Sequence, residues 1–176
     1  MTKFANRVHK VKPSFTLQMA TIAAEMKSKG LDVINFSVGE PDFNTPLKII
    51  EAGKKAMDDG FTKYTAGPGM VELRQAICTK LKRENGLSYE PADILVSNGE
   101  KQSLYNVCQA LFDEGDEVVI FRPYWVSFPE FVRLSDAEPI LVDTLPEKNF
   151  EPDFNDLKSK INSKIKGVIL NSPSNP

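Results

Sequence analysis

The sequence predicts an α/β fold in which helices cover both faces of a mostly parallel sheet. The main reason is that short apolar runs of strand length alternate with segments of helical periodicity from residue 92 onward. The size is that of one ordinary globular unit, because 176 residues, 41% of them apolar, can bury a core without disulfides or metals. The chain has no internal repeat and no low-complexity linker.

The first half of the chain is predicted to be mainly helical, with helices at residues 14–29, 46–59 and 71–85. Ser14 can cap the first helix, Pro46 suits the first turn of the second, and Gly86 supplies a left-handed stop for the third. An apolar run at 33–36 is predicted to be a short strand that feeds a loop. The Gly-Pro-Gly sequence within 61–70 forbids regular structure there.

In the second half, strands are predicted at 94–97, 117–121, 139–143 and 167–171, and helices at 100–112, 124–135 and 153–160. Parallel strands need a crossover connection, usually a helix, so this alternation favours a parallel sheet. Cys108 lies on the apolar stripe of its helix and is predicted to pack in the core. A composition shift near 43–46 is the only plausible domain seam.

The composition argues against several classes of function. Lys plus Arg number 22 against 24 Asp plus Glu, so there is no electrostatic footprint for a nucleic acid or an anionic membrane. The apolar runs fall far short of a span of ~20 residues, and the N-terminus lacks the apolar stretch of a secretory signal. We therefore expect a cytoplasmic enzyme. Cys78, Cys108 and the single histidine, His9, have no metal-ligand spacing, which excludes a zinc site.

Ligands bind beyond the carboxyl ends of the strands in an open α/β sheet, so the turns after the predicted strands are candidate sites. Ser97–Gln102 is a small-residue turn that enters a helix, where free amides and the helix dipole favour a phosphate. The alternative is a glycine required only by the steric needs of the turn. Trp125 follows the run 117–121 and either stacks on an aromatic cofactor or anchors the core or an interface.

Two further turns follow predicted strands. Asn171–Pro176 has two prolines after polar residues, which makes a rigid turn that can point an amide at a ligand. Gly39 offers its amide to a carboxylate, or else belongs to an ordinary turn in which Glu40 and Asp42 are solvated. We discount these two carboxylates as paired catalytic acids, because no proton-transfer partner is evident nearby.

Five sequence blocks together make the chain similar to a known family. They are VGEPDFNTP at 38–46, KYTAGPGMVELR at 63–74, SNGEKQSLYN at 97–106, PYWVSFPE at 123–130 and NSPSNP at 171–176. The blocks resemble those of fold-type I pyridoxal-phosphate aminotransferases, in particular the bacterial aspartate and aspartate/prephenate aminotransferase group. The resemblance covers the whole chain and implies the large pyridoxal-phosphate-dependent transferase fold. In that fold residues 1–45 would be an arm and helix of a smaller domain, and 46–176 the first part of the large cofactor-binding domain.

The resemblance also implies how pyridoxal 5'-phosphate would be held. Gly99, Glu100 and Lys101 would cradle its phosphate through backbone amides, Trp125 would stack on its ring, and Asn175 would hydrogen-bond the phenolic oxygen. Glu100 departs from the family pattern, in which a small residue often stands beside the phosphate. If only the backbone of Glu100 contacts the phosphate, its acidic side chain points away.

The residues implied to bind substrate are Gly39, Trp125 and Asn175 for one carboxylate, and Lys101 and Thr16 for the far carboxylate of aspartate or prephenate. Tyr64 would reach the phosphate of a neighbouring subunit, which implies a homodimer with shared active sites. The resemblance implies no metal.

The implied reaction moves an amino group between aspartate, with glutamate or prephenate as further partners, and a 2-oxo acid. Two alternatives within enzymes are another fold-type I aminotransferase, acting on alanine, tyrosine or kynurenine, and a β-lyase. A third, of a different class, is a non-catalytic cofactor-binding module. The family's Schiff-base lysine lies beyond residue 176, so no catalytic residue is assigned. Residues 1–176 by themselves are expected to be an inactive fragment.

Overall fold

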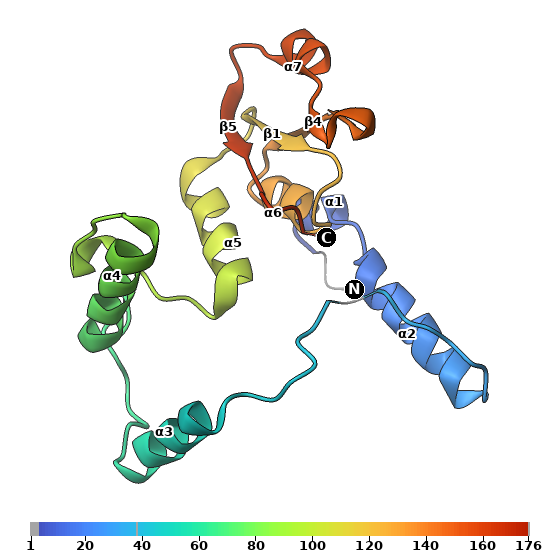
Figure 1. Ribbon diagram of the computed structural model, residues 1–176. Coiled ribbons are helices and arrows are strands. Elements are labelled where there is room, and N and C mark those ends of the chain that lie inside the picture. Colours follow the sequence, from blue (N-terminus) through green and yellow to red (C-terminus); the bar gives the residue numbers. More distant parts are fainter. Residues whose placement is uncertain (1–3, 38, 176) are drawn as a thin grey trace. The chain divides into compact units, whose positions relative to one another are not determined.

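The computed structural model describes residues 4–37 and 39–175. Two compact units make up the chain: unit 1 takes in Met1–Glu40 and Leu104–Pro176, and unit 2 takes in Pro41–Ser103. Unit 2 is the cyan-to-green part of Figure 1. No helix within residues 4–37 and 39–175 is long and apolar enough to cross a membrane.

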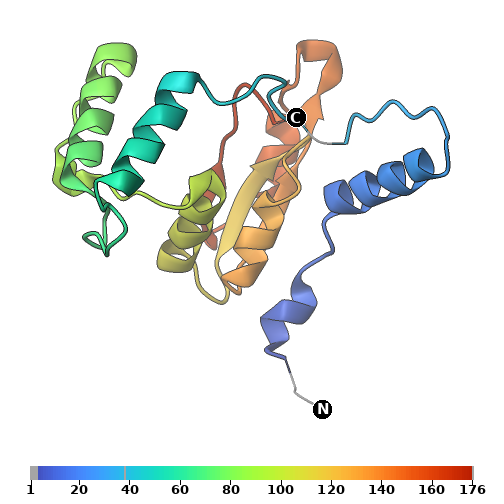
Figure 2. The ribbon, with the colours of Figure 1, turned by 90° about the horizontal axis from the view of Figure 1, so that it is seen from below.

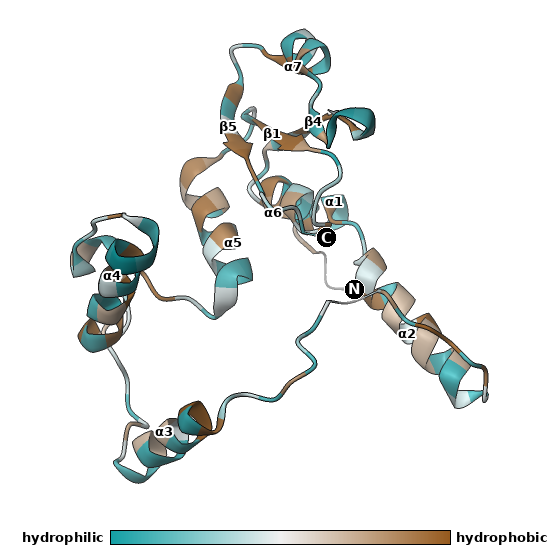
Figure 3. Ribbon diagram, in the orientation of Figure 1, coloured by the Kyte–Doolittle hydropathy of each residue, from teal (hydrophilic) through white to brown (hydrophobic). Residues whose placement is uncertain are grey.

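Unit 1 contains a three-stranded parallel sheet in the order β2–β1–β5. Its strands are β1 (Glu117–Phe121), β2 (Glu138–Val142) and β5 (Ile165–Ile169). In the central strand β1, Val119 pairs with Ile140 on one side and Val168 on the other. Figure 3 shows β1 in the brown of hydrophobic residues, as expected for a strand whose two faces are packed. The sheet confirms the α/β prediction.

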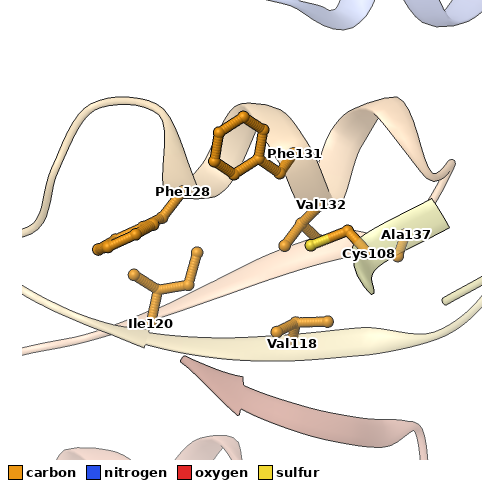
Figure 4. Packing of buried hydrophobic residues seen from close by; sticks show 7 residues of the cluster. All are labelled: Cys108, Val118, Ile120, Phe128, Phe131, Val132 and Ala137. Atoms are coloured by element: carbon orange, nitrogen blue, oxygen red, sulfur yellow. The ribbon is translucent and has the colours of Figure 1, made fainter. Parts of the chain in front are cut away.

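One face of this sheet packs against α5 (Gly99–Leu111) and α6 (Phe128–Leu134). The buried cluster between them consists of Cys108, Val118, Ile120, Phe128, Phe131, Val132 and Ala137. Figure 4 shows the α6 side chains facing the strands, with Cys108 entering from α5. Burial of Cys108 raises the pKa of its thiol. The predicted packing role of this cysteine is confirmed.

Unit 1 also contains elements outside this sheet and its two packed helices. They are α1 (Asn6–Lys10), α2 (Phe15–Ser28), the antiparallel pair β3 (Thr144–Leu145) and β4 (Glu151–Pro152), the short 3₁₀ helix η2 (Pro146–Lys148) and α7 (Phe154–Lys160). Ser14 caps α2 as predicted, because its hydroxyl accepts the amide of Leu17. Helix α1 lies beside α6 (Figures 1 and 2).

Unit 2 consists of α3 (Leu47–Asp58), α4 (Val71–Asn85), the 3₁₀ helix η1 (Pro91–Asp93) and connecting loops. Gly86 ends α4 in the left-handed conformation, as predicted. The guanidinium of Arg74 on α4 donates to the Pro91 carbonyl at 2.8 Å and joins α4 to η1. The helices predicted at 46–59 and 71–85 are confirmed.

Two predicted strands, 33–36 and 94–97, are wrong. Neither run pairs with another strand among the described residues, and Phe36 is 91% exposed. Within 94–97, Val96 donates its amide to the carbonyl of Pro68, a loop residue, at 2.9 Å. Apolar β-branched residues satisfy the strand pattern, but a strand exists only where a neighbour supplies the ladder of hydrogen bonds.

The helix predicted at 124–135 begins later than expected, at Phe128. The reason is a turn that precedes it, in which the Phe128 amide donates to the Trp125 carbonyl at 3.0 Å. The other predicted helices and strands of the second half are present with small shifts of their ends. The β3–β4 hairpin and α1 have no counterpart among the predicted elements.

Candidate active site

The turn Ser97–Lys101, here called the phosphate turn, leads into α5. Gly99 has φ +77°, a conformation that a residue with a side chain adopts only under strain, and its amide donates to the Ser97 carbonyl at 2.8 Å. The Asn98 amide donates to the side chain of Gln102 at 2.6 Å. The amides of a first helical turn have no partner within the helix and attract anions. The Asn98 and Gly99 amides already donate within the turn, and Glu100 and Lys101 stand in the first turn of α5.

Ser97 contributes a second feature of the phosphate turn. Its hydroxyl oxygen is buried and has no hydrogen-bond partner within the part of the chain that the structure describes. A buried hydroxyl without a partner costs free energy, which a bound group with acceptor oxygens would recover. The residues of this turn fit a phosphate. Sequence analysis named Ser97 only as the start of a turn, because its burial depends on the surrounding fold.

The loop at residues 66–69 supports the phosphate turn within unit 2. The Gly69 amide donates to the Ala66 carbonyl at 2.8 Å, and Gly69 has φ +102°. A Cβ atom on Gly69 would lie 2.9 Å from Cβ of Val96. Glycine thus lets the loop approach the residue that directly precedes Ser97, and any larger residue at position 69 would push the two apart.

Trp125 lies in the turn Arg122–Ser127 that follows β1, in unit 1. Its ring meets Phe128 edge-on at 5.5 Å and Phe131 at 5.9 Å between ring centroids. Edge-to-face contacts of this kind hold an aromatic ring in one orientation. The indole is therefore anchored to α6, and its predicted second role, stacking on a cofactor, stays a prediction.

A cleft of roughly 550 Å³ opens where β1 and β5 end. Its wall includes Tyr124, which precedes Trp125, and Ser174, which precedes Asn175. The side chain of Asn171 accepts the Asn175 amide at 2.7 Å and closes the turn that carries Asn175. The residues expected to contact ring and carboxylate thus come from two turns that border one cleft of unit 1.

The rim of this cleft carries a chain of charged contacts. Arg122 donates to the Asp143 carboxylate at 2.8 Å, and this hydrogen bond raises the pKa of the guanidinium. Asp156 accepts from Lys160 and from the Asp143 amide, and these bonds lower the pKa of its carboxyl group. These contacts order the segments after β1 and β2, since they join residues far apart in sequence.

The predicted site residues are divided between the two units. Unit 1 contains Thr16, Gly39, Trp125 and Asn175, and unit 2 contains Tyr64, Gly99, Glu100 and Lys101. Thr16 lies in the first turn of α2, and Glu100 and Lys101 are exposed in the first turn of α5. Tyr64 is fully exposed on its loop.

The parallel sheet β2–β1–β5, packed against α5 and α6, defines an α/β protein. The chain belongs to the aminotransferase class I and II family, whose family model matches residues 31–176. The resemblance stated from the sequence blocks is therefore confirmed.

Individual relatives agree with this assignment. The chain is 48% identical over 172 residues to an aspartate aminotransferase of Bacillus sp. (strain YM-2), covering 98% of this chain and 44% of the relative. It is 44% identical to a probable aspartate/prephenate aminotransferase of Thermus aquaticus, covering 100% and 46%. The structure of Thermus thermophilus aspartate aminotransferase with maleate superposes with a TM-score of 0.93 at 43% identity, covering 100% and 46%. The chain thus spans about half the length of these relatives.

Proposed function

We propose that the complete gene product, meaning the protein encoded by the whole reading frame, is a pyridoxal-phosphate-dependent aminotransferase that uses aspartate and a 2-oxo acid. Glutamate or prephenate would serve as a further amino donor or acceptor. The observation that carries this proposal is the phosphate turn, whose buried Ser97 hydroxyl has no partner within residues 4–37 and 39–175, in a chain similar throughout to aspartate aminotransferases.

The chain's own residues would hold the cofactor at three points. The backbone amides of Glu100 and Lys101, joined by that of Gly99 once it is released from the Ser97 carbonyl, would bind the phosphate. Trp125 would cover the ring, and the Asn175 amide group would donate to the phenolic oxygen. When bound, pyridoxal phosphate acts as the electron sink for bond breaking at the amino acid's α-carbon. Because only the backbone of Glu100 is used, its carboxylate points into solvent and stays clear of the anion.

Other residues would orient the substrate. The Gly39 amide, Trp125 and Asn175 bind the carboxylate next to the reacting carbon, and Lys101 with Thr16 binds the distal one. A substrate held at both carboxylates presents one Cα–H bond in a defined direction. Binding energy is thus used to orient the bond that reacts. We assign residues 1–45 to a smaller domain and 46–176 to the large cofactor-binding domain of this enzyme.

A direct test is an amino-transfer assay with the purified complete gene product. We expect aspartate and 2-oxoglutarate to yield oxaloacetate and glutamate in equal amounts, and alanine to be a poorer donor, because it lacks the second carboxylate. The cofactor is followed separately by its visible absorbance. Bound cofactor with transfer from alanine or tyrosine alone would shift the assignment to another aminotransferase. Absence of bound cofactor would contradict the proposal altogether.

We further propose that the enzyme is a homodimer in which Tyr64 binds the cofactor phosphate of the partner subunit. Full exposure of Tyr64 on its loop is what such a reach requires. Tyr64→Phe removes one hydroxyl and is expected to weaken cofactor binding about tenfold, the lower end for a bond to a charged group. Equilibrium dialysis of the cofactor measures this, with Tyr89→Phe as the control. An unchanged cofactor Kd, together with an active monomer in sedimentation, would exclude the shared site.

A further inference from the structure

The two carboxylate oxygens of Glu130, on α6, have different partners. Oε1 accepts from the guanidinium of Arg133, one turn later on the same helix, and Oε2 accepts the backbone amide of Lys12 at 3.0 Å. The side chains of Glu130 and Arg133 are only 17% and 19% exposed. Glu130 therefore joins α6 to a segment that precedes it by 118 residues.

This contact acts at the start of α2. Lys12 is followed by Pro13, whose ring restricts the backbone on both sides, and by Ser14, which caps α2. Fixing the Lys12 amide thus sets where α2 begins and where Thr16, in its first turn, lies relative to α6. The link from Lys12 to Thr16 is short and contains one proline.

The same helix fixes Trp125. The Phe128 amide at the start of α6 donates to the Trp125 carbonyl at 3.0 Å, and Phe131 packs against the indole. Helix α6 therefore fixes Trp125, which lies in the turn before it and is expected to cover the cofactor ring, and through Glu130 it holds the segment that leads to Thr16. All of these contacts lie within unit 1.

The hydrogen bond between Glu130 and the Lys12 amide is important because, within the described part of the chain, few other contacts hold residues 11–15 against α6. A cavity of roughly 550 Å³ lies between residues 11–15 and α6, with Glu130 and Arg133 in its wall. Side-chain packing across this gap is therefore incomplete. A second polar contact, between Lys10 and Asp136 at 3.0 Å, has side chains 50% and 38% exposed. Exposed ion pairs of this kind contribute little, because water and salt screen them.

We propose that Glu130 is a positioning residue: it anchors the Lys12–Ser14 segment to α6 and so places Thr16 for the distal carboxylate of the substrate. The substrate part of this proposal rests on the proposed aminotransferase function. Glu130 touches neither substrate nor cofactor in this role. Its loss should therefore affect the KM for aspartate more than kcat, and should leave cofactor affinity unchanged.

The main test of this role is Glu130→Gln in the complete gene product. Glutamine has one acceptor oxygen, and its NH₂ group must face either the Arg133 guanidinium or the Lys12 amide, both of which are donors. We expect amide hydrogen exchange in a peptide covering residues 11–17 to become about tenfold faster. We also expect the KM for aspartate to rise about tenfold with kcat changed less than about twofold, and the KM for alanine to stay unchanged.

Two further variants serve as controls for this test. Asp136→Asn breaks the exposed contact to Lys10 on the same surface and should leave exchange over 11–17 unchanged. The double variant Glu130→Met, Arg133→Met removes both carboxylate oxygens, and with them the Lys12 contact, without leaving a guanidinium unpaired, so a change in exchange cannot come from an isolated charge. It should show the same faster exchange as Glu130→Gln.

Unchanged exchange over 11–17 in both Glu130 variants would overturn the anchoring role. Faster exchange with an unchanged KM for aspartate would overturn the positioning role, because Glu130 would then stabilise the segment without affecting substrate binding. If the wild type transfers no amino group, the proposed function has failed and the positioning role fails with it. The exchange rates still decide in that case whether Glu130 anchors the segment.

Discussion

Replacing Phe131 by alanine is expected to lower the free energy of unfolding by about 3–5 kcal/mol. Phe131 is only 6% exposed and belongs to the cluster that joins α6 to the sheet. Alanine leaves a cavity there that the rigid strand β1 cannot close, so the lost contacts are not replaced. Chemical denaturation of the complete gene product, followed by far-ultraviolet circular dichroism, measures the change.

The same substitution should alter Trp125, since Phe131 is one of its two edge contacts. Trp125 is the only tryptophan of the 176 residues, and we expect its fluorescence anisotropy to fall as the indole gains freedom. Phe154→Ala is the control, because Phe154 on α7 is 61% exposed and its loss should cost under about 1 kcal/mol. Equal losses of stability in the two variants would contradict the placing of the core between α6 and β1.

Replacing Lys101 by alanine is expected to reduce kcat/KM for aspartate about tenfold to a hundredfold, and to reduce it far less for alanine or phenylalanine. Lys101 stands in the first turn of α5, so its backbone can serve the phosphate while its ammonium group extends to a distal carboxylate. Only a dicarboxylate offers the second charge, so the loss should be selective. Steady-state kinetics with each amino donor measures it, and prephenate is tested as acceptor.

Lys158→Ala, an exposed lysine on α7, is the matched control and should change none of these values. An equal fall for every amino donor in Lys101→Ala would mean that Lys101 serves the cofactor or the fold. Specificity for the second carboxylate would then come from residues other than Lys101. Cofactor affinity, measured in parallel, separates the two cases, because a distal-carboxylate contact leaves it unchanged.

Much of the fold could be predicted because its signals are local. Ser14 and Gly86 act through hydrogen bonds and backbone conformation within one helical turn, so the ends of α2 and α4 follow from a few neighbouring residues. The apolar run of β1 is long enough to require burial on both faces, which indicates a central strand. The family could be assigned from the order and spacing of the five sequence blocks along the chain.

The features of the fold that could not be predicted depend on contacts between residues distant in sequence. The run 94–97 has a strand pattern, yet Val96 pairs with the Pro68 loop, and no local signal distinguishes a loop partner from a strand partner. A lone glutamate on a helix is normally solvated, so the link from Glu130 to Lys12 was not predicted.

The sequence alone was enough to predict the α/β class, most helix ends, the core position of Cys108 and the family. Strand pairing and the hold of α6 on both Trp125 and the segment before α2 follow only from the fold. The same is true of the Ser97 hydroxyl, which is buried with no partner among the described residues. Pairing and burial depend on what the rest of the chain places opposite a residue, whereas caps and periodicity depend on its neighbours.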